Sequence, residues 1–344
     1  MGIPTVRFRF SSDPEPHKSR RHQMLKKHPE LRALFGRNPW SAVLIFGLLT
    51  LQFFLGWLTA DMSSPIHIGL ALSLGAVLTH ALFVLIHECT HCLVLNGSRA
   101  NRLLAMTANL GITFPLAMGY RKLHLLHHAE KGDPMRDGDI PSQKEANWVG
   151  SSPIRKLIWI ALFFYFEGVS RVSERRNATY SDPWIRESTV LQLAFQIFLF
   201  THYPAVAHYL LLSTLFGLGA GPFMGKWIGE HFAINGMQET YSYYGPLNRL
   251  MFNAGFHHEH HDLPAVPWNR IRKVKQQAPE FYETLASHSS YRRLCWRFIA
   301  DRELTLWCRV TRGRHSSNYS EASGLTVSPQ RTYEPSRSQV AEGA

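Results

Sequence analysis

Long apolar runs alternate with charged segments along this chain. Residues 42–60 contain no charged side chain, and residues 66–86 contain none apart from two histidines. Each run is long enough to cross a hydrocarbon core of about 30 Å as a helix. The pattern therefore predicts two membrane-spanning helices, joined by the short polar link at residues 61–65.

Apolar stretches recur later in the chain. Residues 189–200 and 205–219 are separated by a short turn and predict a second pair of spans. Residues 103–119 are apolar but contain Gly111 and Pro115, so they predict a re-entrant or interfacial helix rather than a span. We therefore expect an all-α integral membrane fold with four transmembrane helices, supplemented by re-entrant or interfacial helices.

The two ends of the chain differ from this apolar middle. Between His17 and Phe35, leucines interleave with Arg and Lys, as in an amphipathic helix lying on a membrane surface. Residues 1–40 are thus expected to form a basic interfacial arm and residues 41–310 the membrane domain. Residues 311–344 are rich in Ser, Gly, Pro and charge, which predicts a disordered tail.

The formal charge of +12 is unevenly distributed. Nine Lys and Arg residues precede the first apolar run, whereas the link at residues 61–65 has none. The positive-inside rule then places the N-terminus in the cytosol, and four spans return the C-terminus there. A basic excess can also indicate nucleic-acid binding, but no such motif is present. We expect anionic lipid rather than nucleic acid to face these charges.

Three histidine clusters carry the candidate chemistry. They read HECTH at 87–91, HLLHH at 124–128 and HHEHH at 257–261. On a helix, histidines three or four positions apart share a face, so each cluster can present imidazoles together. Each imidazole removed from water needs a partner, and eight exceed the needs of one metal ion. The spacing predicts a two-metal centre with these ligands: His87, His91, His124, His127, His128, His257, His260 and His261.

Topology agrees with a single centre. The first cluster follows two predicted crossings, which return it to the cytosol, and the last pair of spans lies between the second and third clusters. All three clusters can therefore meet in one cytosolic, histidine-rich di-metal cap. Imidazole suits Fe, Zn, Cu and Ni, so the ligands alone leave the metal open.

Other polar residues near these clusters have different expected roles. His231 follows the last predicted span and is expected to be a ninth ligand. His80 lies seven residues before His87, about 10 Å deeper along a helix, and is expected to be a packing residue. His258 should point away from its neighbours and not bind metal. Four carboxylates are candidates to accept hydrogen bonds from imidazole N–H groups, or are solvated surface residues: Glu88, Glu230, Glu259 and Asp262.

Two other protein classes fit parts of the sequence. His87-Glu88-x-x-His91 matches the zinc peptidase motif, but that interpretation leaves six clustered histidines unused. A metal transporter would place its ligands near the bilayer midplane, whereas these clusters lie at span ends and in loops. Cys89 and Cys92 form a single C-x-x-C pair, which is a weak metal or redox signal.

The chain resembles the sphingolipid Δ4-desaturases (dihydroceramide desaturases), within the membrane fatty acid desaturase and hydroxylase superfamily. The resemblance runs from about residue 8 to about residue 310 and covers nearly the whole expected fold. That family usually has Asn at the position of His258. The motifs that carry the resemblance are Pro16-His17-Lys18-Ser19-Arg20-Arg21 with Pro29-Glu30-Leu31, Gly229-Glu230-His231, the segment ETYSYYGPLN at 239–248, and FHHEHHD at 256–262.

The resemblance implies a non-haem di-iron centre held by the eight clustered histidines and His231. It implies O₂-dependent formation of the trans C4–C5 double bond of dihydroceramide, giving ceramide. The alternatives are C4 hydroxylation to phytoceramide, or another fatty-acyl desaturation. Electrons would come from NAD(P)H through a reductase and cytochrome b5. The expected location is the endoplasmic reticulum membrane, or the inner membrane with a ferredoxin in a bacterium.

Overall fold

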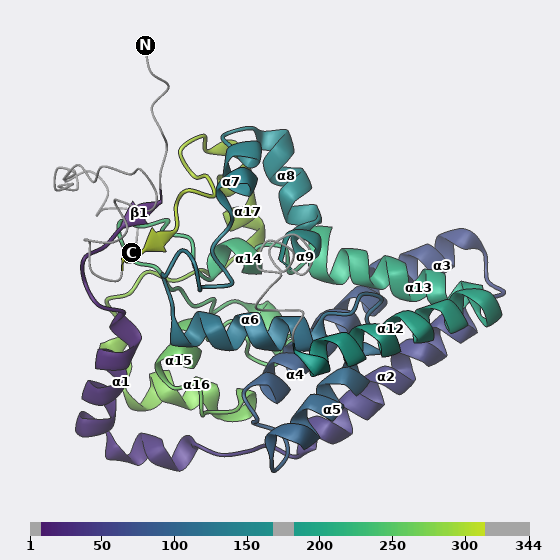
Figure 1. Ribbon diagram of the computed structural model, residues 1–344, viewed down its shortest axis with the longest axis horizontal. Coiled ribbons are helices and arrows are strands. Elements are labelled where there is room, and N and C mark those ends of the chain that lie inside the picture. Colours follow the sequence, from purple (N-terminus) through teal and green to yellow (C-terminus); the bar gives the residue numbers. More distant parts are fainter. Residues whose placement is uncertain (1–7, 168–181, 314–344) are drawn as a thin grey trace. The chain divides into compact units, whose positions relative to one another are not determined.

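The computed structural model describes residues 8–167 and 182–313, and most of these residues are helical (Figure 1). One compact unit, Met1–Arg312, contains all the helices and strands of the described residues. The predicted disordered tail lies almost wholly outside the described residues. The proposed boundaries of the arm and the membrane domain stay predictions.

The first two predicted spans are present as long apolar helices. Helix α2 covers Trp40–Leu58, and a continuous helix over Ser64–Thr90 consists of α3 (Ser64–Leu70), a π-helical turn and α4 (Ala76–Thr90). Both helices are long and apolar enough to cross a membrane. Large apolar side chains of α2, among them Trp40 and Phe46, are exposed on its outer face, as expected of a lipid-facing helix.

The second predicted pair forms the helices α12 (Pro183–His202) and α13 (Pro204–Leu215), with a π-helical extension over Phe216–Ala220. Pro204 starts α13 directly after the turn at Tyr203, because proline fits the first turn of a helix. Helix α13 packs against α2, α4 and α12. Among the described helices, only the first two combine the length and apolarity of a span, so the four-span arrangement stays a prediction.

The interrupted apolar segment at 103–119 forms two helices joined by a turn. Helix α5 (Ser98–Asn109) packs along α4, and α6 (Ala117–Ala129) begins after the turn. The Asn109 side chain holds this turn: its Nδ2 donates to the Phe114 carbonyl at 2.8 Å, and its Oδ1 accepts from the Leu116 and Ala117 N–H groups at 2.9 and 2.7 Å. The turn thereby sets the start of α6, which carries the second histidine cluster.

The N-terminal segment departs from the predicted single amphipathic helix over His17–Phe35. Helix α1 covers Pro16–Lys27, and a 3₁₀ helix follows over Pro29–Leu34. Pro29 disfavours the helical conformation at His28 and lacks the N–H that would continue the helix. The apolar side chains of this segment, including Met24 and Leu31, are buried against the protein's own C-terminal helices. The prediction that they face a membrane is therefore wrong for these side chains.

Shorter helices and one pair of strands make up the rest of this unit. The strands β1 (Arg9–Phe10) and β2 (Val310–Thr311) pair in parallel, a small exception to the predicted all-α fold. Two residues are too few to show the alternation that predicts a strand. The remaining helices of the described residues are α7 (Gln143–Val149), α8 (Pro153–Ala161), α9 (Phe163–Tyr165), α14 (Lys226–Gly229), α15 (His257–Asp262), α16 (Trp268–Gln277), α17 (Tyr291–Ala300) and 3₁₀ turns over Pro246–Arg249 and Pro279–Phe281.

Candidate metal centre and its cavity

Four segments that are distant in sequence bring their histidines together. His87 lies near the end of α4 and His91 caps it. Helix α6 carries three of the predicted ligands, α15 carries another three besides His258, and His231 lies just after α14. All nine predicted ligands are buried or half-buried, and they fall into two adjoining groups.

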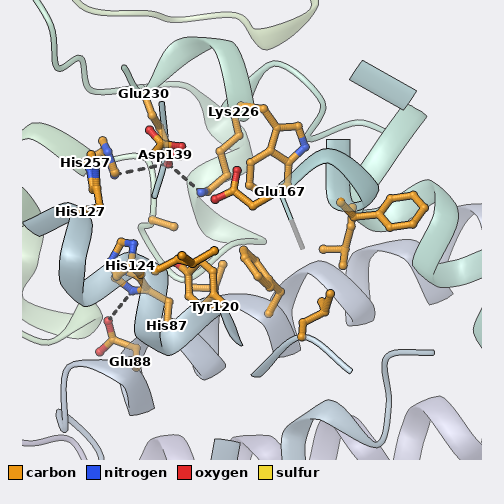
Figure 2. Close-up of a pocket in the computed structure, with 18 of the residues that line it drawn as sticks. His87, Glu88, Tyr120, His124, His127, Asp139, Glu167, Lys226, Glu230 and His257 are labelled. Carbon is orange, nitrogen blue, oxygen red and sulfur yellow. Dashed lines mark ion pairs between the residues drawn. The ribbon is translucent and has the colours of Figure 1, made fainter. Parts of the chain in front are cut away.

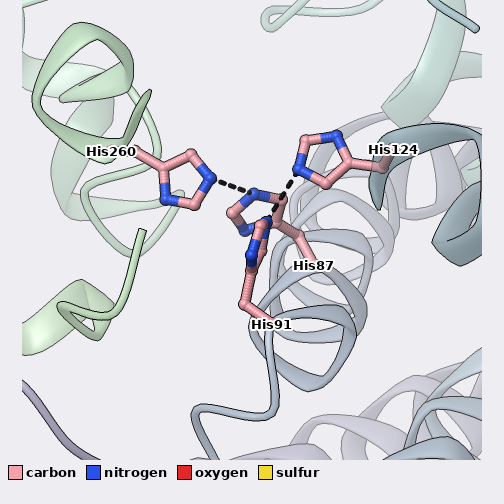
Figure 3. Close-up of side chains that lie close together, drawn as sticks. All are labelled: His87, His91, His124 and His260. Atoms are coloured by element: carbon pink, nitrogen blue, oxygen red, sulfur yellow. Dashed lines mark hydrogen bonds between the residues drawn. The ribbon is translucent and has the colours of Figure 1, made fainter. Parts of the chain in front are cut away.

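The first group contains His87, His91, His124, His128 and His260. Their Nε2 atoms form a continuous series of close contacts. The His87–His260, His260–His128, His128–His124 and His124–His91 separations are 3.0, 3.2, 3.1 and 2.9 Å. Figure 3 shows four of these rings turned toward one another, from α4, α6 and α15. Ring nitrogens of His87, His91, His124 and His260 lie within 4.8 Å of one another, and His128 Nε2 contacts two of these residues.

The second group contains His127, His231, His257 and His261. The Nε2 atom of His231 lies 3.0 Å from that of His127 and 2.8 Å from that of His257. Ring nitrogens of His127, His231 and His261 lie within 4.8 Å of one another. The His261 ring packs against both His231 and His257, with centroids 4.8 and 4.6 Å apart. This group offers four imidazole nitrogens.

Helices α6 and α15 supply ligands to both groups. On α6, His124 and His128 face the first group and His127 the second; on α15, His260 faces the first group and His257 and His261 the second. The rings of His128 and His261 stack between the groups, 4.2 Å apart and 6° from parallel. The two groups are therefore direct neighbours.

Hydrogen bonds at Nδ1 orient several of these rings. His231 Nδ1 lies 3.2 Å from the Glu239 carbonyl, which can only accept, so Nδ1 carries the proton and Nε2 keeps its lone pair. His127 Nδ1 likewise faces Asp137 Oδ1 at 2.7 Å. His257 Nδ1 lies 3.4 Å from Glu230 Oε1, an ion-pair contact rather than a hydrogen bond. All three rings belong to the second group, so these partners turn their Nε2 lone pairs toward that group.

Burial keeps most of these imidazoles neutral. Burial, followed by the positive charge of Arg121, lowers the pKa of His91 to about 3. Burial, followed by charge repulsion from neighbouring groups, lowers the pKa well below the ordinary value for six other members of the two groups. A metal ligand must be deprotonated at the coordinating nitrogen, so this environment favours cation binding. The six are His124, His128, His231, His257, His260 and His261.

The residues fit a pair of metal ions. Two nitrogens bonded at right angles to one ion, each at about 2.1 Å, lie about 3.0 Å apart. The Nε2 separations of 2.8–3.2 Å match this spacing. Lone pairs that face one another at such distances repel, and a shared cation removes that repulsion. Sets of five and four imidazoles suit first-row ions such as iron or zinc.

His258 and His80, the two histidines that the sequence excluded from the ligand set, lie outside both groups. His258 Nδ1 contacts the Thr240 carbonyl at 3.0 Å, and its ring packs against His17 rather than against the centre. His80 Nδ1 contacts the Gly217 carbonyl at 3.0 Å, and its ring stacks on Phe223. Both imidazoles thus lie away from the clustered Nε2 atoms, as predicted.

The four candidate carboxylates have different partners. Only Glu230 lies close to an imidazole N–H of the two groups, that of His257. Glu88 accepts from the Trp268 backbone N–H at 3.0 Å, and its carboxylate is 3.8 Å from His87 Nδ1. Glu259 accepts from the hydroxyls of Ser242 and Tyr244, and Asp262 pairs with His17. Asp137 and the Glu239 carbonyl were not among the predicted partners. Asp137 stands in no motif, and a backbone carbonyl has no sequence signal of its own, although Glu239 begins the segment at 239–248.

A cavity of about 280 Å³ opens beside the histidines. Six of the nine line it, drawn from both groups, and aliphatic and aromatic side chains form most of the remaining wall. Figure 2 shows a polar patch at the histidine end, where Tyr120, Asp139, Glu167, Lys226 and Glu230 gather. One sequence signal could have revealed part of this patch. Lys226 and Glu230 are four positions apart, and Glu230 directly precedes His231.

Comparison with known proteins identifies the family. The profile of the fatty acid desaturase family matches residues 63–292, and that of the sphingolipid Delta4-desaturase family matches residues 7–40. The chain is 35% identical over 313 residues to a sphingolipid delta(4)-desaturase DES1-like protein of Oryza sativa subsp. japonica, covering 90% of this chain and 94% of that protein.

Animal relatives show the same relationship. The chain is 36% identical over 311 residues to sphingolipid delta(4)-desaturase DES1 of Drosophila melanogaster, covering 89% of this chain and 95% of that protein. It is 34% identical over 309 residues to sphingolipid delta(4)-desaturase/C4-monooxygenase DES2 of Rattus norvegicus, covering 89% and 94%. The resemblance drawn from the motifs is confirmed: the chain belongs to the sphingolipid delta(4)-desaturase family and is a membrane oxidoreductase.

Proposed function

We propose that this enzyme is an O₂-dependent di-iron desaturase that introduces the trans C4–C5 double bond of dihydroceramide and releases ceramide. One observation carries the proposal: two adjoining groups of imidazoles, five and four, lie at the end of a largely apolar cavity. The nine histidines proposed as ligands are His87, His91, His124, His127, His128, His231, His257, His260 and His261.

The cavity suits a hydrocarbon substrate. Phe114, Phe164, Ile185 and Leu218 are among its apolar lining residues. Burial of a methylene chain against such walls is favourable by about 0.8 kcal/mol for each CH₂ group. The same walls exclude water from the histidines, which limits side reactions there. A lipid chain can therefore lie with its reacting carbons beside the two groups.

The protein's own residues hold and orient the centre. When bound, a pair of iron ions would supply the O₂-dependent removal of hydrogen from an unactivated methylene, which side-chain acids and bases cannot perform. Asp137, the Glu239 carbonyl and Glu230 fix the orientation of His127, His231 and His257 through their Nδ1 atoms. NAD(P)H, a reductase and cytochrome b5 are the proposed source of electrons.

We place the enzyme in the endoplasmic reticulum membrane with four spans and both termini in the cytosol. The apolar outer faces of α2 and α12 support this placement, since Val43, Val190 and Ile197 are each about 60% exposed. Arg121, Lys122 and Arg136 flank the second histidine cluster, as expected on a cytosolic face.

C4 hydroxylation is the second candidate. The rat relative is named both a delta(4)-desaturase and a C4-monooxygenase. Both outcomes begin at the same carbon and diverge when either a second hydrogen is removed or a hydroxyl group is added.

Expression in cells that lack ceramide desaturation, followed by lipid mass spectrometry, tests the proposal. Ceramide with a C4–C5 double bond supports desaturation, and 4-hydroxylated product supports the second candidate. Formation of neither product, from protein that contains iron, would contradict the substrate assignment. Purified protein that lacks iron but holds zinc would contradict the di-iron centre.

A further inference from the structure

Charged side chains line the cavity directly beside the second histidine group. Lys226 Nζ lies 2.7 Å from Glu230 Oε1, and the two side chains are only 9% and 14% exposed. The same Glu230 oxygen lies 3.4 Å from His257 Nδ1. This connects the Lys226 ammonium to the histidine centre through one carboxylate.

Other polar groups extend this patch. Glu167, two residues after the end of α9, also lines the cavity, and Figure 2 shows it with Lys226 and Glu230. The Tyr120 ring stacks on His124, with centroids 5.0 Å apart, and it too lines the cavity. Together with Asp139, which also lines the cavity, the patch combines an ammonium, three carboxylates and a phenol beside the histidines.

Orientation of His257 does not account for this set. One acceptor, Glu230, is enough to hold the His257 N–H, and His127 and His231 achieve the same result with one acceptor each. Placing an additional lysine at an apolar cavity wall has a desolvation cost that is recovered only when polar partners are present. An ammonium carries three N–H donors, so it can bind a ligand oxygen in addition to Glu230.

The proposed reaction requires polar contacts in this place. In an N-acyl sphinganine, the reacting C4 is bonded to C3, which bears a hydroxyl group, and C2 bears the amide. Any pose that brings C4 to the histidines therefore brings a hydroxyl and an amide within a few bonds of them. An entirely apolar wall there would leave these groups without hydrogen bonds.

We infer that Lys226, with Glu230 and Glu167, forms a polar subsite that binds the C3 hydroxyl and the neighbouring amide of a sphingoid lipid and thereby fixes which carbons face the histidines. This inference rests on the proposed function. It makes Lys226 a specificity-determining residue for the lipid headgroup, whereas the histidines provide the reactive centre. A plain fatty-acyl chain lacks these polar groups and gains nothing from the subsite.

Equilibrium binding to the full-length protein in detergent micelles tests the inference independently of turnover. The probes are N-octanoyl sphinganine and its 3-deoxy analogue, which lacks only the hydroxyl. The wild type should bind the analogue at least about tenfold more weakly, because a site built for a hydroxyl rejects a ligand without one. Lys226→Met, which keeps the length but removes the donors, should reduce that ratio to about twofold.

Lys156→Met is the matched control. Lys156 is also a buried lysine, but it donates to the Phe298 and Asp301 carbonyls at 2.8 and 2.6 Å, away from the cavity. This variant should keep the wild-type binding ratio. A tenfold ratio that survives in Lys226→Met, or equal binding of both probes by the wild type, would overturn the inference even if ceramide is formed. Hydroxyl-dependent binding without any ceramide product would support the subsite and contradict the proposed desaturation.

Discussion

The Nδ1 atom of His17 lies 2.6 Å from the Asp262 carboxylate, although 245 positions separate the two residues in sequence. Both side chains are buried, and Asp262 directly follows the ligand candidate His261. Arg20 and the Tyr282 hydroxyl also donate to Asp262, each at 3.0 Å. The N-terminal helix α1 therefore holds the end of α15, which carries three of the nine histidines.

A chain of hydrogen bonds continues from this pair toward α6. Lys131 donates to the Thr240 hydroxyl, which lies 2.9 Å from His17 Nε2. Burial, followed by the positive charge of Lys131, lowers the pKa of His17 well below its ordinary value, so the ring is neutral and donates from Nδ1. Burial alone would raise the pKa of Asp262, but its hydrogen bond with His17 and nearby positive charges hold it below its ordinary value. This geometry gives the segment matched by the sphingolipid Delta4-desaturase profile a structural role beside the centre.

Asp262→Asn should destabilise the protein and lower its metal content. Removal of one partner from a buried charged network costs about 3–5 kcal/mol, and the loss falls on the helix that carries His257, His260 and His261. Thermal unfolding and iron analysis of the purified protein measure both effects. The control is Glu280→Gln, which removes an exposed partner of Lys27 and should leave both values unchanged. Full iron content in Asp262→Asn would refute the proposed role of α1.

His128→Ala should abolish turnover, whereas His258→Ala should retain a substantial part of it. His128 Nε2 lies 3.1 and 3.2 Å from two other Nε2 atoms of the first group, but His258 bonds to the Thr240 carbonyl outside both groups. Product formation per folded protein is the measurement. Equal losses in the two variants would show that the third cluster has been misassigned.

His231→Ala should lower the iron content of the purified protein by about half, because four nitrogens become three in only one of the two groups. None of the Nε2 contacts that define the first group involves His231. His80→Gln is the control, since this buried imidazole of α4 lies outside both groups. An unchanged iron content in His231→Ala would remove His231 from the ligand set.

His288 should contribute to acid sensitivity. Burial, followed by the charge of Arg297, lowers the pKa of His288 to about 4. The folded state therefore binds fewer protons than the unfolded state between pH 6.5 and 4, and stability present above pH 6.5 is lost as the pH falls through this window. The loss from this residue reaches at most about 3 kcal/mol near pH 4.

Comparison of the wild type with His288→Phe isolates this effect. The difference between their thermal midpoints should change with pH between 6.5 and 4, and stay constant above that window. A difference that does not vary with pH would show that His288 keeps an ordinary pKa.

Cysteine labelling tests the proposed topology. Ser63→Cys and Tyr203→Cys, in the two predicted lumenal links, should react with a membrane-impermeant reagent only from the lumen. Lys144→Cys, in an exposed position after the second histidine cluster, should react only from the cytosol. Labelling of Tyr203→Cys from the cytosolic side would show that α12 and α13 do not cross the membrane as proposed.

The sequence determined the parts of this protein that depend on local spacing. Uninterrupted apolar runs predicted the helices over Trp40–Leu58 and Ser64–Thr90, because the length of a span is a property of one segment. Histidines three and four positions apart predicted which imidazoles share a helix face, because the helical repeat is fixed. The exclusion of His80 and His258 followed from the same local geometry.

Only the tertiary structure decided how these parts combine. The division of α6 and α15 between two groups depends on the packing of α4, α6 and α15, and no local repeat encodes contacts between segments so far apart. The same holds for the hydrogen bond from His17 to Asp262, which fixes part of the N-terminal segment in a buried position against α15. Lys226 and Glu167 joined one cavity wall for the same reason: long-range packing, rather than local spacing, determines which distant side chains share a site.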